Sequence, residues 1–494
     1  MKYVLGIDIG TGSVKAVAVS FDSEANGDAQ YHYPTYSPQA GYSEQDPDLI
    51  WEAFTSCLQE MVNRMQAVPV AICLSSAMHS LIPVNKLGRK LANMITWADC
   101  RSDSIATRLK LSAGGQQIYE WSGMPLHAMS PLCKIIWLRE KMPKVFKQTH
   151  KFISIKEYIW FKLFGDFVID HSMAGATGML DISSLTWKSE LLDLAGIRED
   201  QLSRLVKTDY AFRGSCSLSG ILKNDSAFII GASDGCLANL GSFAIRKGVA
   251  AITIGTSGAV RIASKRPIIN TSAMTFSYCL DENTFICGGP VNNGGNALEW
   301  LITCFLGKTL KENAFTEVFT MVEQVPSGAE GLLFLPYLNG ERAPVWDANS
   351  SGAFIGICSH HTQAHFCRAV LEGICFALND VLLAVEDGSE IINQINVSGG
   401  FVNSQTWMQL LSNITGKRLA LIHVQDASAM GAAFLALKAL GLNGGEYPAE
   451  PDQTPQLIEP DMDEHIRYSK NFLIFKSLYS SLKDSMHQLN VIKN

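Results

Sequence analysis

The segment 4–19 places an acid, two hydroxyls and a lysine around a glycine-rich turn: Asp8, Thr11, Ser13 and Lys15. Backbone amides and hydroxyls in a turn of small residues can approach an anion closely, and a lysine beside the turn adds positive charge. A carboxylate at the end of the first strand can hold a divalent cation, directly or through water. We therefore predict a phosphate-binding hairpin with a magnesium site at Asp8; an ordinary glycine-rich hairpin is the alternative.

A second segment, 249–263, has the same outline of apolar strand, Gly-Thr turn and apolar strand. Gly255 and Thr256 form its turn, and it follows the first segment by about half of the 494 residues. A two-copy repeat of this span indicates a duplicated domain rather than a solenoid. Thr253 stands where the first copy has Asp8, so the second tip offers a neutral hydroxyl and amides. Two such tips could clamp a polyphosphate; a coincidence of two similar hairpins is the alternative.

Two predicted strand ends carry further candidate side chains. Met78 and His79 follow an apolar strand over 68–74, and ligands of open α/β sheets lie just beyond such strand ends. Asp234 follows an apolar strand over 228–232, where its carboxylate could act as general base for a bound hydroxyl. A structural histidine and a helix N-cap aspartate are the corresponding alternatives.

A loop with an aromatic ring, an acid and a base is a second candidate for contacting a polar ligand. Trp97, Asp99 and Arg101 alternate along a segment that we predict to be extended, which would place all three on one side. An aromatic plate with a carboxylate and a guanidinium suits a polyhydroxylated molecule. An Asp–Arg surface pair beside a core tryptophan is the alternative.

The hydropathy pattern predicts the elements that position these residues. Helices are expected to begin at Asp46, which precedes a proline, and to cover 365–378 and 427–440. Gly431 is expected to make a close packing contact in the last of these helices. Residues 287–300 are expected to form a glycine loop that enters a helix.

Bulk composition is that of a globular protein with a sizeable core. Apolar residues make up 47% and charged residues 18%, and the length suggests about three domains or two large ones. A net charge of −7 without a long basic run argues against nucleic acid or an anionic membrane as partner. The twelve cysteines lack zinc-ligand spacing, and no apolar run reaches the ~18 residues of a membrane span. We predict a soluble, cytoplasmic protein with reduced thiols.

Two longer motifs carry a family resemblance. Residues 129–140 resemble the first signature of the FGGY carbohydrate kinases, and 352–357 with 365–372 match the second. The paired Gly-Thr hairpins and the Ser-Gly-Gly-Phe-Val-Asn segment at 398–403 resemble the same family, which belongs to the actin and Hsp70-like ATPase superfamily. The resemblance runs from residue 3 to about 440.

The resemblance implies an α/β fold with two duplicated actin/Hsp70-like (ribonuclease H-like) ATPase domains and an interdomain cleft. We expect the domains over 1–245, with the sugar site, the hairpin and the catalytic aspartate, and over 246–494, with the nucleotide site. It implies that Asp8 helps to hold Mg²⁺ and that Asp234 is the catalytic base. The sugar contacts that it implies are Met78, His79, Trp97, Asp99, Arg101 and Asp234. The ATP contacts that it implies are Thr11, Ser13, Lys15, Gly255, Thr256, Gly295, Glu299, Gly400 and Asn403. Position 299 is a glutamate where some members of the family have glutamine.

The substrate expectation comes from four segments that look most like those of gluconate kinases: 77–80, 95–102, 292–295 and 340–349. They imply ATP-dependent phosphorylation of gluconate to 6-phosphogluconate, with Arg101 as the partner of the substrate carboxylate. Kinases of xylulose or another sugar or polyol are alternatives, because xylulose kinases have similar Met-His and Trp-x-Asp-x-Arg segments. A non-catalytic sugar sensor and an Hsp70- or actin-like ATPase are the readings from other classes. We expect ATP, Mg²⁺ and a small sugar or sugar acid as partners, and no nucleic acid or membrane; a homodimer is left open.

Overall fold

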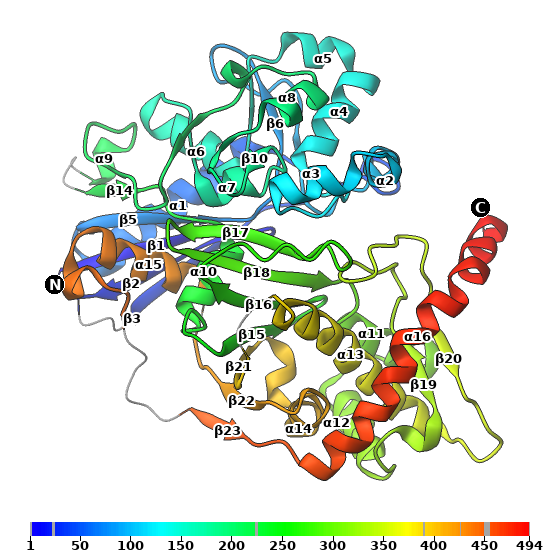
Figure 1. The fold of residues 1–494 in the computed structure, drawn as a ribbon. Coiled ribbons are helices and arrows are strands. Elements are labelled where there is room, and N and C mark those ends of the chain that lie inside the picture. Colours follow the sequence, from blue (N-terminus) through cyan, green and yellow to red (C-terminus); the bar gives the residue numbers. More distant parts are fainter. Residues whose placement is uncertain are drawn as a thin grey trace. The chain divides into compact units, whose positions relative to one another are not determined.

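The chain folds into two compact units, shown in Figure 1. The computed structural model describes residues 2–21, 25–222, 226–388, 391–424, 426–448 and 455–493. The first unit is formed by Met1–Phe243, Ser264–Cys287 and Val424–Pro451. The second unit is formed by Ala244–Ala263, Gly288–His423 and Asp452–Asn494. The domains 1–245 and 246–494 stay a prediction. Within the described ranges, no helix is both long and apolar enough to cross a membrane.

A mixed sheet forms the centre of the first unit. Its strands are, in order, β13 (Ala211–Phe212), β14 (Ala227–Ile229), β5 (Ala71–Ser76), β1 (Tyr3–Ile9), β2 (Ser13–Ser20) and β3 (Ala25–His32). β1 is antiparallel to β2 and parallel to β5, and β5 is parallel to β14. The hairpin predicted within 4–19 is therefore confirmed, and the ends of β1, β5 and β14 meet at one edge of the sheet.

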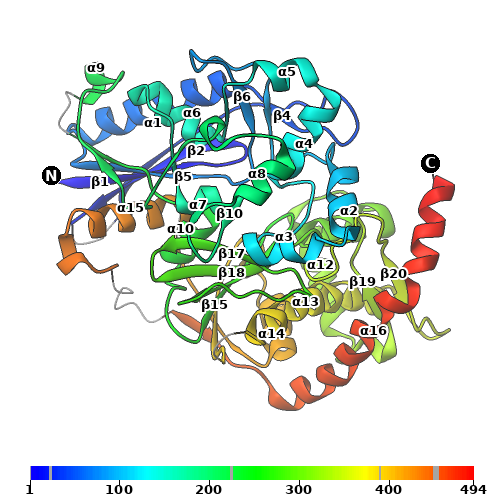
Figure 2. The ribbon, with the colours of Figure 1, turned by 45° about the horizontal axis from the view of Figure 1, so that its top comes forward.

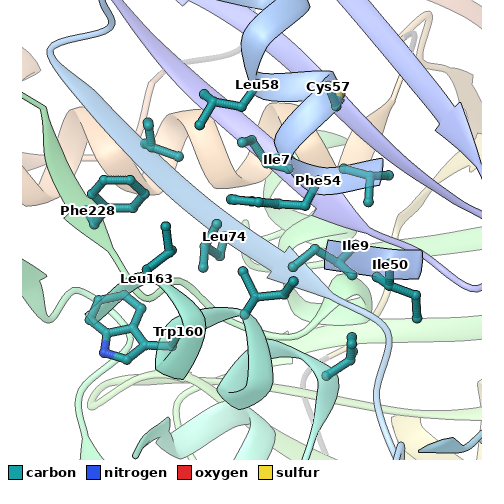
Figure 3. Close-up of a cluster of buried hydrophobic side chains, with 14 of the residues drawn as sticks. Ile7, Ile9, Ile50, Phe54, Cys57, Leu58, Leu74, Trp160, Leu163 and Phe228 are labelled. Atoms are coloured by element: carbon teal, nitrogen blue, oxygen red, sulfur yellow. The ribbon is translucent and has the colours of Figure 1, made fainter. Parts of the chain in front are cut away.

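Side chains on the two faces of β1 have different surroundings. Alternate residues of a strand point to opposite faces, and Ile7 and Ile9 join a core with Ile50 and Phe54 of helix α1 (Pro47–Met65), as Figure 3 shows. The intervening residues, including Asp8, face the other side. Asp46 caps α1 through the amide of the second helical residue, so the predicted helix start is confirmed.

Helices cover both faces of this sheet. Figure 2 shows α1 and α6 along one side and α15 along the other. The helices of the first unit are α1, α2 (Asp103–Leu111), α3 (Gly115–Ser122), α4 (Pro131–Lys141), α5 (Pro143–Gln148), α6 (Ile155–Phe164), α7 (His171–Gly175), α8 (Ser189–Ala195), α9 (Ser219–Leu222), α10 (Asp234–Gly241) and α15 (Ala427–Ala439). The helix predicted over 427–440 is thus confirmed as α15.

The second sheet repeats the pattern of the first. Its order is β17 (Phe276–Asp281), β18 (Thr284–Val291), β16 (Gly258–Ser264), β15 (Val249–Ile254), β21 (Gln394–Ser398), β22 (Arg418–Leu421) and β23 (Gln456–Ile458). β15 is antiparallel to β16 and parallel to β21, as β1 is to β2 and β5. The second hairpin is therefore confirmed, and the two hairpins occupy equivalent places in their sheets. The glycine loop predicted at the start of 287–300 is wrong over residues 287–291, because β18 continues to Val291.

The second unit has its own α-helices, and short two-stranded ladders and short 3-10 or π-helical turns complete the described elements. The helices are α11 (Gly295–Trp300), α12 (Glu312–Glu323), α13 (Gln363–Glu386), α14 (Gln405–Thr415) and α16 (Met462–Lys493). The ladders are β4–β7 (Glu44–Gln45, Met94–Ile95), β6–β8 (Ile82–Val84, Lys151–Ile153), β12–β9 (Arg204–Val206, Val168–Asp170), β10–β11 (Leu180–Asp181, Thr186–Trp187) and β19–β20 (Leu333–Leu335, Ala353–Ile355). α13 confirms the helix predicted over 365–378.

Candidate active site

The tip of the first hairpin presents polar groups to solvent. Thr11 and Gly12 are exposed, and the Gly10 amide donates to the Ser13 carbonyl at 3.0 Å, which closes the turn. The Ser13 hydroxyl is buried and accepts a hydrogen bond from the Gln30 amide at 2.9 Å. Thr11 and Gly12 are therefore exposed at the tip, whereas the buried Ser13 hydroxyl accepts from Gln30 and can offer an anion only its own hydrogen.

Three carboxylates and one lysine lie together behind this tip. Asp8 is buried and accepts a hydrogen bond from the Ser75 hydroxyl at 2.6 Å. Lys15 is opposite Asp8 in the strand register and forms a 2.9 Å ion pair with Asp426. Burial and the charges of Asp426 and Asp234 raise the pKa of Asp8 to about 7, against the opposing effects of Ser75 and Lys15. The cluster carries more negative than positive charge; among the described residues, no group of three or more His, Cys, Asp or Glu side chains is arranged to hold a metal ion.

Two helix starts supply the other acids of this cluster. Ser233 is the N-cap of α10 and accepts from the Cys236 amide, so the interpretation of Asp234 as the N-cap is wrong. Asp234 is the first residue of α10 and projects from its first turn. Asp426 is the N-cap of α15 and accepts from the Ala429 amide at 2.9 Å. Sequence reasoning missed Asp426, although an acid before an alanine-rich helix is an N-cap signal.

Glycines allow the elements that carry these acids to touch. A Cβ at Gly431 of α15 would lie 1.9 Å from the Leu237 carbonyl oxygen of α10, and one at Gly241 would lie 2.0 Å from that of Ala427. A Cβ at Gly6 of β1 would meet the backbone of α15 at 1.8 Å. The close contact predicted for Gly431 is confirmed, and it brings α10, α15 and β1 into direct backbone contact.

The loop after β5 holds its histidine firmly. His79 has a φ of 65°, an uncommon value for a residue with a side chain. Its Nδ1 lies 2.9 Å from the Ala176 carbonyl oxygen, and its Nε2 lies 3.3 Å from the Tyr278 hydroxyl. Met78 is half-buried against a small apolar cluster. The strand end therefore presents His79 in one fixed orientation.

The loop after β7 is a turn, so the predicted extended segment is wrong. The Trp97 indole donates to the Thr11 hydroxyl at 2.9 Å, which links this loop to the hairpin tip. Asp99 instead accepts two hydrogen bonds from the Arg101 guanidinium, at 2.8 and 2.7 Å. Arg101 also pairs with Glu44 at 2.7 Å. The turn thus directs the indole and the Asp–Arg pair to different partners.

The Asp99–Arg101 pair is interior. The side chain of Arg101 is 4% exposed and that of Asp99 is 0% exposed, so the alternative of a surface pair is also wrong. The guanidinium lies 3.9 Å from the ring centre of Tyr42 and 5.2 Å from that of Trp137. Two carboxylates and two rings therefore surround Arg101.

In the second unit, glycines converge on the tip of the second hairpin. Gly255 and Thr256 are exposed, and the Gly295 amide donates to the Gly255 carbonyl at 2.7 Å. A Cβ at Gly399 would lie 2.3 Å from the carbonyl oxygen of Ile254, whereas Gly400 beside it has open space. The hairpin tip, the start of α11 and the glycine pair after β21 therefore meet. Exposed backbone of this kind can approach phosphates or a flat base.

Two further predicted nucleotide contacts, Glu299 and Asn403, are exposed at α11 and just after the glycine pair. Glu341, which the sequence did not single out, anchors the turn before α11. Its carboxylate accepts from the backbone amide of Asn292 and, at 3.1 Å, from the side-chain amide of Asn293. Burial raises the pKa of Glu341 to about 7.

The chain matches family models and known proteins over almost its whole length. The model of the FGGY family of carbohydrate kinases, N-terminal domain, matches residues 3–241, and that of the C-terminal domain matches 250–440. A gluconokinase from Bacillus licheniformis is 37% identical, with 99% of this chain and 98% of that protein covered.

Solved structures agree with these matches. A gluconate kinase from Lactobacillus acidophilus is 35% identical with a TM-score of 0.92, covering 99% of each chain. A ligand-bound xylulose kinase from the same species is 35% identical with a TM-score of 0.92, covering 99% of this chain and 100% of that one. The predicted fold of duplicated actin/Hsp70-like domains is confirmed. The repeated hairpin, the two signature motifs and the family matches agree. This chain belongs to the FGGY family of carbohydrate kinases, which use ATP as phosphoryl donor.

Proposed function

We propose that this chain transfers the γ-phosphoryl group of ATP to the terminal hydroxyl of gluconate, giving 6-phosphogluconate. The observation that carries the proposal is the cluster of Asp8, Lys15, Asp234 and Asp426 behind an exposed Gly-Thr tip. The gluconokinase and gluconate kinase relatives support this choice of acceptor.

The proposed reaction is an in-line displacement with Asp234 as general base. Its carboxylate accepts the proton of the attacking hydroxyl, while Lys15 and the backbone of the hairpin tip offset charge on the phosphates. Asp8 would hold Mg²⁺, with Asp426 and Asp234 adding negative charge around the ion. When bound, Mg²⁺ would neutralise charge that develops on the transferred group.

We also propose nucleotide contacts in the second unit. Exposed backbone at Gly255, Thr256 and Gly400 suits phosphate oxygens or the base, and Gly295 lies beside the same tip because its amide donates to the Gly255 carbonyl. Glu299 and Asn403 are proposed to contact the nucleoside. In the first unit, Thr11 and Ser13 keep their proposed place at the phosphates.

The proposed sugar contacts are Met78, His79, Trp97, Asp99 and Arg101. Arg101 is the proposed partner of the gluconate carboxylate, which would share the guanidinium with Asp99 and Glu44. Xylulose is the second candidate acceptor, and the matched xylulose kinase structure of equal identity and TM-score favours it.

The test is Mg-ATP turnover with gluconate, xylulose, ribulose and glycerol, comparing wild type with Asp234→Asn. Asp193→Asn, an exposed acid of α8, is the matched control. We expect gluconate-dependent ADP release that falls by about 10²–10⁴-fold in Asp234→Asn and is unchanged in the control.

Each of the other possible results would support a different conclusion about function. Turnover with xylulose but not with gluconate would support the proposed mechanism and show that the acceptor is xylulose rather than gluconate. ATP hydrolysis that ignores every sugar would favour an Hsp70- or actin-like ATPase. Sugar binding without turnover would favour a sensor. Full activity of the Asp234→Asn variant would show that Asp234 is not the general base.

A further inference from the structure

A fully buried lysine connects the two loops of the proposed sugar site. Lys134 of α4 is 0% exposed, and its ammonium donates to the carbonyl oxygens of His79 at 2.6 Å and Thr96 at 2.7 Å. These loops follow different strands, β5 and β7, and are joined here through one nitrogen atom. Lys134 also lies in 129–140, the motif for which the mechanism above gives no role.

Each of the two carbonyls belongs to a backbone that needs external support. His79 has the left-handed φ of 65°, which a residue with a side chain adopts at a cost unless surrounding contacts hold it. Thr96 precedes Trp97, and its amide and hydroxyl are bonded to Ser43 at 3.0 and 2.7 Å. The hydrogen bond from Lys134 to the Thr96 carbonyl further fixes the position of that turn.

Keeping an ammonium at this site is costly for stability. Burial lowers the pKa of Lys134 to about 7, and Asp99, the acid whose charge opposes this shift most, is itself paired with Arg101. An apolar side chain of similar length would avoid the cost of burying the ammonium, but it would leave both carbonyl oxygens without this donor. The two carbonyl bonds, rather than packing, therefore explain the lysine.

We propose that Lys134 is a positioning residue for the carbohydrate acceptor: its two hydrogen bonds set the register of the His79 loop against the Trp97 loop. The inference rests on the proposed function, which places both loops at the acceptor. Lys134 itself is covered by protein and acts through the backbone of its neighbours.

The experiment compares Lys134→Met with Lys141→Met, which removes an exposed lysine from the same helix. The first readout is backbone hydrogen exchange of the free, full-length protein. In Lys134→Met, we expect faster hydrogen exchange than in wild type in the peptides covering 77–80 and 96–101. In Lys141→Met, exchange in these peptides should equal that of wild type. Lys134→Gln, which keeps an N–H donor, should lie between Lys134→Met and wild type.

The second readout is kinetic. Misplaced loops should raise the KM of the accepted sugar by about tenfold or more, while the KM of ATP stays within about twofold of wild type. Unchanged exchange, or faster exchange in one loop alone, would overturn the inference, as would equal changes in both KM values. If wild type phosphorylates no sugar, the proposed function fails, and with it the acceptor role, whereas the exchange data still decide whether Lys134 joins the loops. Should Lys134→Met not fold, the same readouts on Lys134→Gln decide.

Discussion

Replacing Gly431 by alanine should damage both the stability of the first unit and the proposed catalysis. The new Cβ would lie 1.9 Å from the Leu237 carbonyl oxygen, whereas ordinary contacts lie at 3.4 to 4 Å. The obstacle is backbone, so no side-chain rotation relieves it, and α10 and α15 would have to separate by about 1.5 Å. Overpacking of this kind costs about 1–3 kcal/mol or more. At about 2–4 °C per kcal/mol, the Tm should fall by roughly 5 °C.

The same displacement reaches the proposed base. Asp234 is the first residue of α10, so a shift of the helix moves its carboxylate relative to Asp8 and Asp426. A misplacement of about 1 Å can lower a rate by about 100-fold. We therefore expect kcat to fall by about 10- to 100-fold at temperatures where Gly431→Ala remains folded.

The assay pairs Gly431→Ala with Gly220→Ala, a helical glycine of α9 whose Cβ would meet nothing within 4 Å. Thermal unfolding and sugar-dependent ADP release are measured for both. Gly220→Ala should be neutral or more stable by up to about 1 kcal/mol, because alanine restricts the unfolded chain. Equal Tm and kcat for the two variants would refute the reasoning that backbone contact at Gly431 places Asp234.

Two further predictions concern buried charges of the first unit. Lys156 and Asp170 form a 2.7 Å ion pair with both side chains buried, and Lys156 also donates to the Ala232 carbonyl at 2.9 Å. Lys156→Met should destabilise by about 3–5 kcal/mol, because a buried carboxylate loses its cation, and adding Asp170→Asn should recover most of that loss in thermal unfolding. Burial raises the pKa of Glu157 from 4.5 to about 7, so the folded protein keeps this proton to a higher pH than the unfolded chain does. Stability should therefore fall as the pH rises from about 4.5 to 7, by up to about 3 kcal/mol, and Glu157→Gln should flatten that decline of Tm with pH.

Both predictions have clear contrary results. A double variant no more stable than Lys156→Met would show that the uncompensated carboxylate is not the cause of the loss. For Glu157→Gln, an unchanged slope of Tm against pH would assign the decline to other groups.

The sequence predicted the elements whose signals are local. Both hairpins follow from apolar runs on each side of a Gly-Thr turn, and the start of α1 follows from Asp46 before a proline. Gly431 could be predicted as a packing position because a lone glycine in an alanine-rich helix weakens that helix unless a neighbour needs the space.

Where the prediction from sequence was wrong, tertiary contacts determine the conformation of the segment. The segment after Cys287 contains two glycines and a proline, which suggest a loop, yet it continues β18. A Cβ at Gly289 would lie 2.6 Å from the Ala343 side chain, so this glycine serves close packing within a strand rather than a turn. The alternation of Trp97, Asp99 and Arg101 was equally misleading, because a half-buried partner, Glu44, draws the arginine away from the indole.

The acidic cluster shows best why the site could be predicted only in part. Asp8 and Asp234 each follow a strand and could be recognised alone, but Asp426 becomes significant only when α15 packs on α10 and β1. The charges of Asp426 and Asp234 help to raise the pKa of the buried Asp8, which is a cost to the fold, and Lys15 provides the opposing positive charge. A positively charged ligand at these termini would offset that cost. The proposed Mg²⁺ supplies that charge, and its binding should lower the pKa of Asp8 toward the ordinary carboxyl range.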